Sequence, residues 1–347
     1  MTYSQKAVLV GGDARYQVID APFPEQADEG TVVVEISRVG VCGSDVAAFK
    51  DGKPYTPYLS GHEWAGRIIS VGKNVTLLKA GDRVLNCTPK ACQECDTCVA
   101  GHGGRCERAH LLSMGTHPHQ PPHGAYAKRI QIPAEKVMRI PDELTDEQAA
   151  MVEPATVALH GVRRKPVGLG DVAVVLGGGP VGLFAVQFLK LSGAKVLLVE
   201  PVDSRRALGD ALGADGSVHP DDAESAVGAF SNGLGADLVV DCAGLAATLE
   251  AGPLLSRSGG TVVLVSTPLK PVTINPGIWL GREVSLMASL AHLNPEFYVT
   301  IELMISGRLQ TAPLIDKTVG LGGLQDALAQ LASGGAVKIL IDPSLES

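Results

Sequence analysis

The sequence VVLGGGPVGLFAVQFLKLSGAKVLLVE, residues 174–200, decides the fold. It sets Gly177, Gly179 and Gly182 in the pattern G-x-G-x-x-G, directly after a strand-like apolar run and at the start of an amphipathic helical run. In such a setting the first glycine permits a tight turn, the second admits a pyrophosphate against the backbone, and the third lets helix and strand pack closely. The helix N-terminus then faces the phosphates. We therefore predict a Rossmann-type dinucleotide-binding domain.

Glu200 ends the strand that follows and is the acidic residue expected to bind the adenosine ribose. A carboxylate there accepts hydrogen bonds from the ribose hydroxyls and repels a 2′-phosphate, which favours NAD over NADP. Arg205 and Arg206 come shortly afterwards and could grip such a phosphate, so NADP is the alternative. The other predicted cofactor contacts are Pro180 and Val181 at the helix start, and Arg205, which can pack on the adenine or ribose.

The rest of the chain extends this α/β pattern. Short apolar runs separated by helical stretches predict βαβ units and a doubly wound parallel sheet, with strands in residues 171–178, 195–200, 237–244 and 261–266. Residues 1 to about 150 instead carry short strand-like runs between Gly, Pro and Asp turns, which predicts an irregular β-rich domain. After about residue 288 the pattern predicts helix, loop, helix and strand.

Composition limits the classes of function. At 347 residues the chain suits two domains, and 45% hydrophobic residues with 41 glycines suit a globular protein. A net charge of -8 disfavours nucleic acid as a partner. Because no leader pattern and no apolar run of about 18 residues is present, we expect a soluble, cytoplasmic protein with no membrane partner. The 7 cysteines favour metal ligands over a disulfide framework.

Four thiols lie close together in KACQECDTCVAGHGGRCER, residues 90–108. Cys92, Cys95, Cys98 and Cys106 have the short spacings that let four thiolates converge on one zinc ion. Four sulfurs fill every coordination position, so the predicted site is structural. A redox pair would begin a helix in a βαβ unit, and a nucleic-acid finger would need basic surroundings; this glycine-rich, mixed-charge segment offers neither.

A second set of candidate metal ligands is dispersed along the chain. RVGVCGSDVAAF supplies Cys42, SGHEWAGRIISVG supplies His62 and Glu63, and AAMVEPATVALHG supplies Glu153. Beside a dinucleotide fold this set gains weight, because hydride chemistry on an alcohol benefits from a Lewis acid. One thiolate, one imidazole and one or two carboxylates leave a position open, which defines a catalytic zinc. The predicted zinc content is therefore two ions per chain.

These motifs together resemble a known family. GHEWAGRIISVG matches the G-H-E-x2-G-x5-G signature of the zinc-containing medium-chain alcohol dehydrogenases, and the resemblance covers nearly the whole chain. It implies a GroES-like β-rich catalytic domain built from residues 1–155 and 292–347, with a structural zinc lobe at about 87–108. It also implies a Rossmann NAD-binding domain at residues 156–291.

The resemblance assigns roles to the dispersed ligands. It makes Cys42 and His62 direct zinc ligands, with Glu63 or Glu153 completing the set. Three negative charges would weaken the pull of zinc on the substrate oxygen, so we expect one carboxylate to bind and the other to stand nearby. A carboxylate at position 153, where ethanol-type members carry cysteine, is similar to the polyol and sugar dehydrogenase branch.

The resemblance also implies a proton path. Ser44 matches the family hydroxyl that takes the proton from the alcohol, and Asp45 matches the acid that orients His62. Ala47 stands where some members place a relay histidine, so the last step of the path departs from theirs.

The other histidines favour structural explanations. His117, His119 and His123 lie among three prolines, and we expect a surface loop there rather than a metal site. His160 is expected to be a satisfied interior histidine, and Trp64 a core residue.

The predicted function is zinc-dependent hydride transfer between NAD(H) and a secondary alcohol or ketone of a polyol, sugar or cyclitol. A threonine-type amino-alcohol dehydrogenase is the first alternative and would need a cation for the substrate carboxylate. A zinc-free alkene reductase would lack both metal sets, and a zinc-stabilised binding module would lack catalysis. The family implies a homodimer or homotetramer, formed through the Rossmann-sheet edge near residues 277–289.

Overall fold

The computed structural model describes residues 4–51, 60–113, 119, 121–268 and 271–345. The chain divides into two compact units, one made of Met1–Glu153 with Leu314–Ser347 and the other of Pro154–Pro313. None of the helices within these described ranges is both long and apolar enough to span a membrane.

The unit Pro154–Pro313 contains a six-stranded sheet in the order β10-β9-β8-β11-β12-β13. Every neighbouring pair in it is parallel. Strand β8 is buried at every position, as its continuous apolar sequence predicts for a sheet covered on both faces. The strands are β8 (Val172–Leu176), β9 (Lys195–Val199), β10 (Gly216–Val218), β11 (Ala236–Asp241), β12 (Ser256–Leu264) and β13 (Ser285–Ala288).

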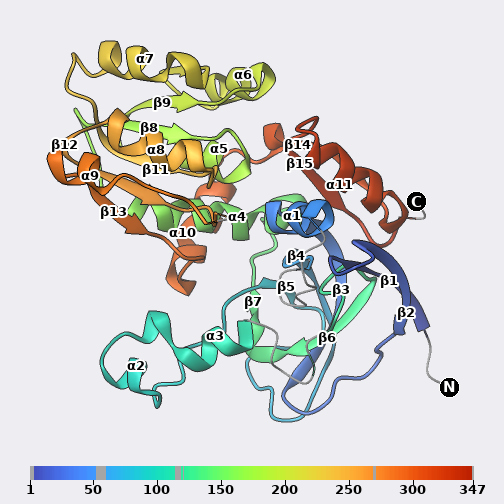
Figure 1. The fold of residues 1–347 in the computed structure, drawn as a ribbon. Coiled ribbons are helices and arrows are strands. Elements are labelled where there is room, and N and C mark those ends of the chain that lie inside the picture. The colour runs from blue at the N-terminus through green and yellow to red at the C-terminus, as the bar shows by residue number, and fades with distance from the viewer. Residues whose placement is uncertain (1–3, 52–59, 114–118, 120, 269–270, 346–347) are drawn as a thin grey trace. The chain divides into compact units, whose positions relative to one another are not determined.

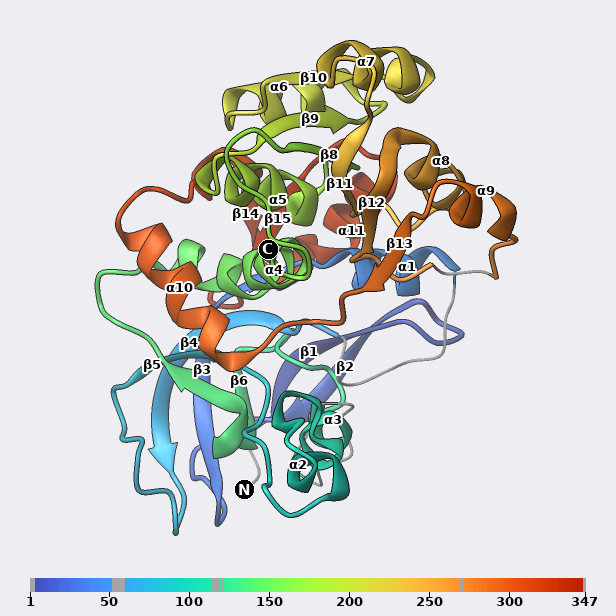
Figure 2. The same cartoon turned by 90° about the vertical axis from the view of Figure 1, so that its left-hand side faces the viewer.

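Helices cover both faces of this sheet. Helices α5 and α6 lie on one side, and α7, α8 and α9 lie on the other (Figure 1, Figure 2). The helices of the unit are α5 (Pro180–Leu191), α6 (Asp203–Ala211), α7 (Ala223–Phe230), α8 (Ala246–Leu255), α9 (Pro276–Gly281) and α10 (Asn294–Ile305). This is the doubly wound arrangement that the glycine pattern and strand spacing predicted, and that prediction is confirmed.

The boundaries of the units differ from the expected ones. The first falls within α4 (Asp146–Arg163), between Glu153 and Pro154, and the second follows Pro313 rather than residue 291. Helix α10 belongs with the second half of α4, because Thr156 donates a hydrogen bond to Thr300 at 3.1 Å. The apolar pattern of α10 gave no sign of this partner.

The other unit is built around a seven-stranded sheet, with strand order β14-β15-β3-β4-β5-β7 and β6 paired to β3. A separate hairpin joins β1 and β2. The strands are β1 (Ser4–Val10), β2 (Tyr16–Pro22), β3 (Thr31–Gly40), β4 (Glu63–Val71), β5 (Arg83–Asn86), β6 (Arg129–Pro133), β7 (Val137–Arg139), β14 (Ile315–Val319) and β15 (Lys338–Ile341). The helices are α1 (Gly43–Asp51), α2 (Asp96–Val99), α3 (Glu107–Ser113) and α11 (Leu324–Ala332), with the first half of α4.

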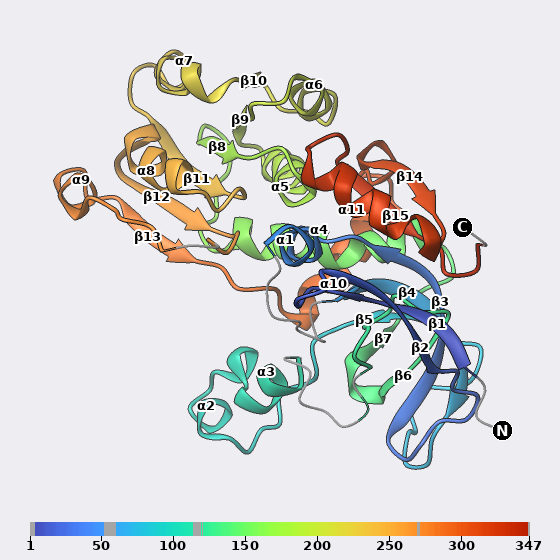
Figure 3. The same cartoon turned by 45° about the vertical axis from the view of Figure 1, so that its right-hand side comes forward.

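The chain end contributes directly to this sheet. Strand β15 pairs antiparallel with the end of β3, placing Leu340 opposite Gly40. The C-terminal elements α11, β14 and β15, drawn in red, lie together in Figure 3. Strand β14 pairs parallel with β15, although we expected no strand between α10 and α11. That expectation was wrong because residues 315–319 show only a weak alternation of apolar and polar side chains. They form a strand by pairing with β15. The core beneath the sheet includes Val34 of β3 and Leu328 of α11.

Candidate metal centres and nucleotide-binding turn

Cys42, His62 and Glu63 come together at one end of the β3–β4 pair. Each offers one ligand atom, and these atoms all lie within 4.8 Å of one another. The register explains the convergence, since Gly40 at the end of β3 lies opposite Glu63 at the start of β4. Cys42 follows β3 and His62 precedes β4, so both occupy turns at the same edge. Sulfur, imidazole and carboxylate form a donor set suited to zinc.

The charges of this group favour a cation at its centre. Burial alone lowers the pKa of His62, but the negative charge and hydrogen bonding of Cys42, with the charges of Glu153 and Asp45, outweigh it and raise this pKa well above its usual value. Cys42 and His62 are partly exposed, whereas Glu63 is buried.

Glu63 is held by a residue from the end of the chain. The Nζ atom of Lys338 donates hydrogen bonds to Oε2 of Glu63 and to the carbonyl of Val41, the latter at 3.0 Å. Both charged side chains are buried, at 1% and 2% exposure. A pair so deeply buried requires both partners, because either charge alone would be costly to desolvate.

Asp45 joins the two turns that carry the candidate ligands. Its Oδ2 atom accepts a hydrogen bond from the backbone N–H of Cys42 at 3.0 Å, and Oδ1 accepts one from Gly61 at 3.3 Å. The hydroxyl of Tyr126 also donates to Oδ2, at 2.9 Å. Asp45 thereby anchors Cys42 and the residue before His62 to one carboxylate.

Glu153 and Ser44 complete the surroundings. Glu153, in α4, lies near enough for its charge to act on His62, but it is outside the compact group of three ligand atoms found among the described residues. The Oγ atom of Ser44, in α1, is buried and has no hydrogen-bond partner in the described part of the chain. Such a hydroxyl is suited to a partner that arrives with the substrate.

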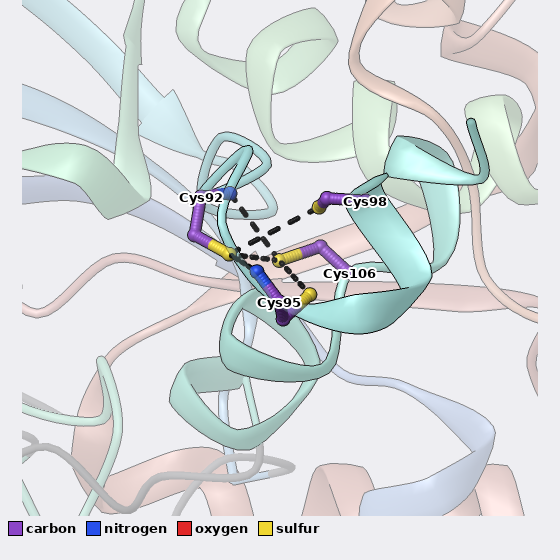
Figure 4. Close-up of side chains that lie close together, drawn as sticks. All are labelled: Cys92, Cys95, Cys98 and Cys106. Carbon is purple, nitrogen blue, oxygen red and sulfur yellow. Dashed lines mark hydrogen bonds between the residues drawn. The ribbon is translucent and has the colours of Figure 1, made fainter. Parts of the chain in front are cut away.

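The four clustered cysteines form the second group, between β5 and β6 (Figure 4). The Sγ atom of Cys106 lies 3.5 Å from that of Cys92 and 3.9 Å from that of Cys95. Cys92 and Cys98 are 4.0 Å apart at Sγ. Zn–S bonds of about 2.3 Å in a tetrahedron place sulfurs about 3.8 Å apart, so the spacing suits one zinc ion.

Backbone N–H groups favour negative charge on the sulfur of Cys106, whereas burial raises the pKa of Cys98 to about 12. Ala109 and Cys92 donate to Sγ of Cys106 at 3.4 Å and 3.3 Å. These bonds lower the pKa of Cys106 to about 6. Cys87 lies just after β5 and outside the group of four, and its burial raises its pKa to about 12.

The glycine turn between β8 and α5 has the geometry of a phosphate-binding turn. Gly177 has a φ of +100°, and a Cβ at Gly182 would lie 1.9 Å from the carbonyl oxygen of Gly177. A Cβ at Gly179 would meet nothing within 4 Å, so space is open at that position. Pro180 is the first residue of α5, and Val181 follows it. A helix N-terminus at such a glycine turn is suited to bind an anion.

Glu200 lies beside this turn with a fixed carboxylate. Its Oε2 atom accepts from the N–H of Gly178 at 2.6 Å, and Oε1 accepts from Val202 at 2.9 Å. Arg205 lies alongside the same turn, because a Cβ added to Gly178 would be 3.3 Å from the Cβ of Arg205. Arg206 donates instead to the carbonyl of Glu200 at 2.6 Å.

The remaining histidines have varied positions. His160 is buried and lies 3.0 Å from Oε1 of Glu296, which confirms the interior position expected for it. His123 is also buried, at 3% exposure, so the expected surface loop was wrong there. His119 lies beside Gln131 at 3.0 Å, and His117 lies outside the described residues.

The reason for the error at His123 is the packing of the residues that follow it. A Cβ at Gly124 would lie 1.6 Å from the carbonyl oxygen of Ser60, so the segment lies directly on the turn before His62. Trp64, at 4% exposure, is a core residue as expected.

The sequence did not predict two residues that contact the group around Cys42, His62 and Glu63. Tyr126 is 81 residues from Asp45, and Lys338 is 275 residues from Glu63. No local spacing connects them to the ligands. The weak signal for Lys338 was a lysine within an otherwise apolar strand run, AVKILI.

Two family models match separate parts of the chain. Residues 28–142 match the family described as alcohol dehydrogenase GroES-like domain, and residues 180–306 match the zinc-binding dehydrogenase family. The chain is similar to a D-arabitol-phosphate dehydrogenase from Enterococcus avium, with 30% identity over 337 residues covering 94% of each chain. It is also similar to a 2-dehydro-3-deoxy-L-galactonate 5-dehydrogenase from Pseudoalteromonas atlantica, 30% identical over 91% of this chain and 93% of the relative.

A solved structure is similar over nearly the whole chain. It is a putative zinc-binding dehydrogenase from Sinorhizobium meliloti bound to NADP, with a TM-score of 0.84 and 27% identity. The alignment covers 98% of this chain and 100% of that one.

Proposed function

Because the chain belongs to the zinc-binding medium-chain alcohol dehydrogenase family, we propose that it transfers hydride between a secondary alcohol of a polyol, sugar or cyclitol and NAD. The observation that carries this proposal is the group formed by Cys42, His62 and Glu63 within 4.8 Å, next to the unpartnered buried hydroxyl of Ser44 within the described residues.

Cys42, His62 and Glu63 would hold the catalytic zinc ion. Their donor atoms suit zinc, and all of them lie within 4.8 Å of one another. We assign Glu63 rather than Glu153 as the carboxylate ligand, because its oxygen lies within the compact group. Lys338 offsets part of the negative charge of Glu63. The ligands Cys42, His62 and Glu63 therefore leave the zinc ion enough positive charge to attract the substrate oxygen.

When bound, the zinc ion supplies a Lewis acid that makes the substrate hydroxyl more acidic. Ser44 would then accept the hydroxyl proton at Oγ while its own hydroxyl proton passes on toward solvent, and the described residues offer Oγ no competing partner. Asp45 keeps Cys42 and His62 in place through their backbone, by the hydrogen bonds to Cys42 and Gly61. Glu153 stands close enough to His62 to stabilise the site electrostatically.

Cys92, Cys95, Cys98 and Cys106 would hold a second, structural zinc ion. The sulfur distances of 3.5 to 4.0 Å support one shared ion, and four thiolates leave no position for a substrate. Each polypeptide would therefore carry two zinc ions with different roles.

NAD is the proposed cofactor. The carboxylate of Glu200 is held beside the glycine turn by Gly178 and Val202, where it would accept the ribose hydroxyls and repel a 2′-phosphate. Arg206 is committed to the carbonyls of Glu200 and Pro201 and to Asp203, which leaves it poorly placed to bind a phosphate. The structural relative bound to NADP makes NADP the cofactor to test against.

The unit roles and the assembly belong to the same proposal. The unit Met1–Glu153 with Leu314–Ser347 would be the GroES-like catalytic domain, and the sheet of Pro154–Pro313 would bind the nucleotide. A homodimer or homotetramer through the β13 edge is supported by Leu280, Leu286 and Leu290, which are 80%, 47% and 58% exposed.

The test is a substrate panel that covers the proposed class. Pentitols, hexitols, their phosphates, sugar acids, cyclitols and L-threonine would be supplied with NAD or NADP while reduced nucleotide is followed by absorbance. We expect chelator-sensitive NADH formation with a member of the polyol, sugar or cyclitol group. Activity confined to threonine would establish the amino-alcohol alternative, and nucleotide binding without turnover across the panel would favour a binding module.

A further inference from the structure

Tyr126 occupies an unusual place beneath the first metal centre. Its side chain is completely buried, at 0% exposure, although it carries a polar hydroxyl. Its backbone is held on both sides: Val8 of β1 donates to its carbonyl at 3.0 Å, and its own N–H donates to His123 at 3.2 Å. These backbone hydrogen bonds therefore fix the position of Tyr126 within the β-rich unit.

The ring packs against the turn that precedes His62. A Cβ at Gly61 would lie 3.1 Å from the ring of Tyr126, and Gly61 has a φ of +53°. Glycine is suited to this position because a side chain would be strained there and would press on the ring. The backbone before His62 is thus supported by the flat face of Tyr126.

The hydroxyl of Tyr126 has one described partner, and that partner is Asp45. The 2.9 Å hydrogen bond ends on Oδ2, the oxygen that also accepts from the N–H of Cys42. The other oxygen of Asp45 accepts from Gly61. A buried carboxylate needs several donors to hold one orientation, and the tyrosine is the single side-chain donor among these three.

From these contacts we propose that Tyr126 is a positioning residue for the catalytic metal, acting through Asp45 on Cys42 and His62. The inference rests on the proposed zinc site and adds a residue to it. Removal of the hydroxyl leaves the Asp45 carboxylate with two of its three donors, which weakens its hold on both ligand-bearing turns. The ring alone would fill the core equally well as phenylalanine, so packing does not explain the hydroxyl.

The experiment compares metal release in Tyr126→Phe and the wild type. Zinc transfer to a colorimetric chelator is followed in time, and the phase that is missing in Cys42→Ser is assigned to the centre at Cys42. We expect that phase to be about 10- to 100-fold faster in Tyr126→Phe, as for other residues that orient metal ligands. The phase from the four-cysteine centre should be unchanged, which makes it an internal control.

Tyr16→Phe is the matched control, because it removes the same atom from a partly buried tyrosine of the same unit that packs against the core. It should release both ions at the wild-type rates. A double-mutant cycle then tests the route: in an Asp45→Ala background, Tyr126→Phe should change the release rate less than twofold.

Equal release from Tyr126→Phe and wild type would overturn the inference, as would an equal acceleration by Tyr16→Phe or a full effect of Tyr126→Phe without Asp45. Each of these leaves the zinc site itself intact. A wild-type protein with a single ion that Cys42→Ser retains would instead defeat the proposed function, and the inference with it.

Discussion

Lys338 and Glu63, 275 residues apart in the chain, form a buried ion pair beside the candidate zinc ligands. The pairing of β15 with β3, and of β3 with β4, brings them together, because Leu340 and Glu63 both lie opposite Gly40. A Cβ at Gly40 would lie 2.9 Å from Cε of Lys338, so the glycine leaves room for the lysine. Strand β15 thereby brings Lys338 into contact with one of the candidate zinc ligands.

Replacement of Lys338 by methionine should destabilise this unit. In the zinc-free protein it leaves Glu63 buried without a counter-charge, which costs about 3–5 kcal/mol in free energy of unfolding. Lys6→Met is the matched control, because Lys6 and Asp20 form an exposed pair worth about 0–1 kcal/mol. Urea unfolding is followed by the fluorescence of Trp64 in a Trp279→Phe background, so that the signal comes from this unit. A loss for Lys338→Met no larger than that for Lys6→Met would contradict the prediction, and Lys338→Arg should recover part of the stability.

Replacement of Cys106 by serine should empty the four-cysteine centre alone. We expect zinc content to fall by one ion and trypsin cleavage at exposed Arg105 and Arg108 to accelerate about tenfold or more, because the metal supplies the folding free energy of the lobe. Cys87→Ser, also at a buried cysteine but outside the cluster, should retain both ions. Retention of two ions by Cys106→Ser would show that the four sulfurs do not share a zinc ion.

Replacement of Glu200 by alanine should weaken NADH binding. Hydrogen bonds to a charged group are worth about 1.5–3 kcal/mol, so the dissociation constant should rise about 10- to 100-fold. NADPH binding should stay the same or improve, since the repulsion of its 2′-phosphate is removed. Fluorescence titration with each nucleotide measures both, and exposed Glu224→Ala serves as the control for loss of one negative charge. An equal loss for both nucleotides would mean that Glu200 supports the turn without selecting NAD.

The local patterns of the sequence were sufficient for the fold class and the family. The strand-turn-helix context of Gly177 predicted the parallel sheet, because that geometry is fixed within 27 residues of continuous chain, 174–200. The spacing of Cys92 and Cys95 likewise predicted the four-sulfur cluster, whose members lie within one short lobe. Where a site is built from neighbours in sequence, its residue types and spacing are informative.

Contacts between distant segments could not be predicted in this way. Tyr126, Lys338 and the burial of His123 depend on which strands pair across the sheet and which turn packs on another. The polar composition around His123 indicated a surface loop. Instead, Gly124 packs on Ser60, and His123 is buried. The sequence left open which of Glu63 and Glu153 binds the metal, and only Glu63 lies in the compact group of candidate ligands found among the described residues.

The central claim is that Cys42 helps to hold a catalytic zinc ion with an open coordination position. Elemental analysis of the active wild type and of Cys42→Ser, alongside turnover, tests it most directly. The wild type should carry two ions per chain, and Cys42→Ser should carry one, with NADH affinity within about twofold of wild type and turnover reduced about a thousandfold or more, as expected when a metal-bound reaction centre is lost. A fully active wild type with one ion, or a Cys42→Ser variant that keeps its activity, would contradict the assignment.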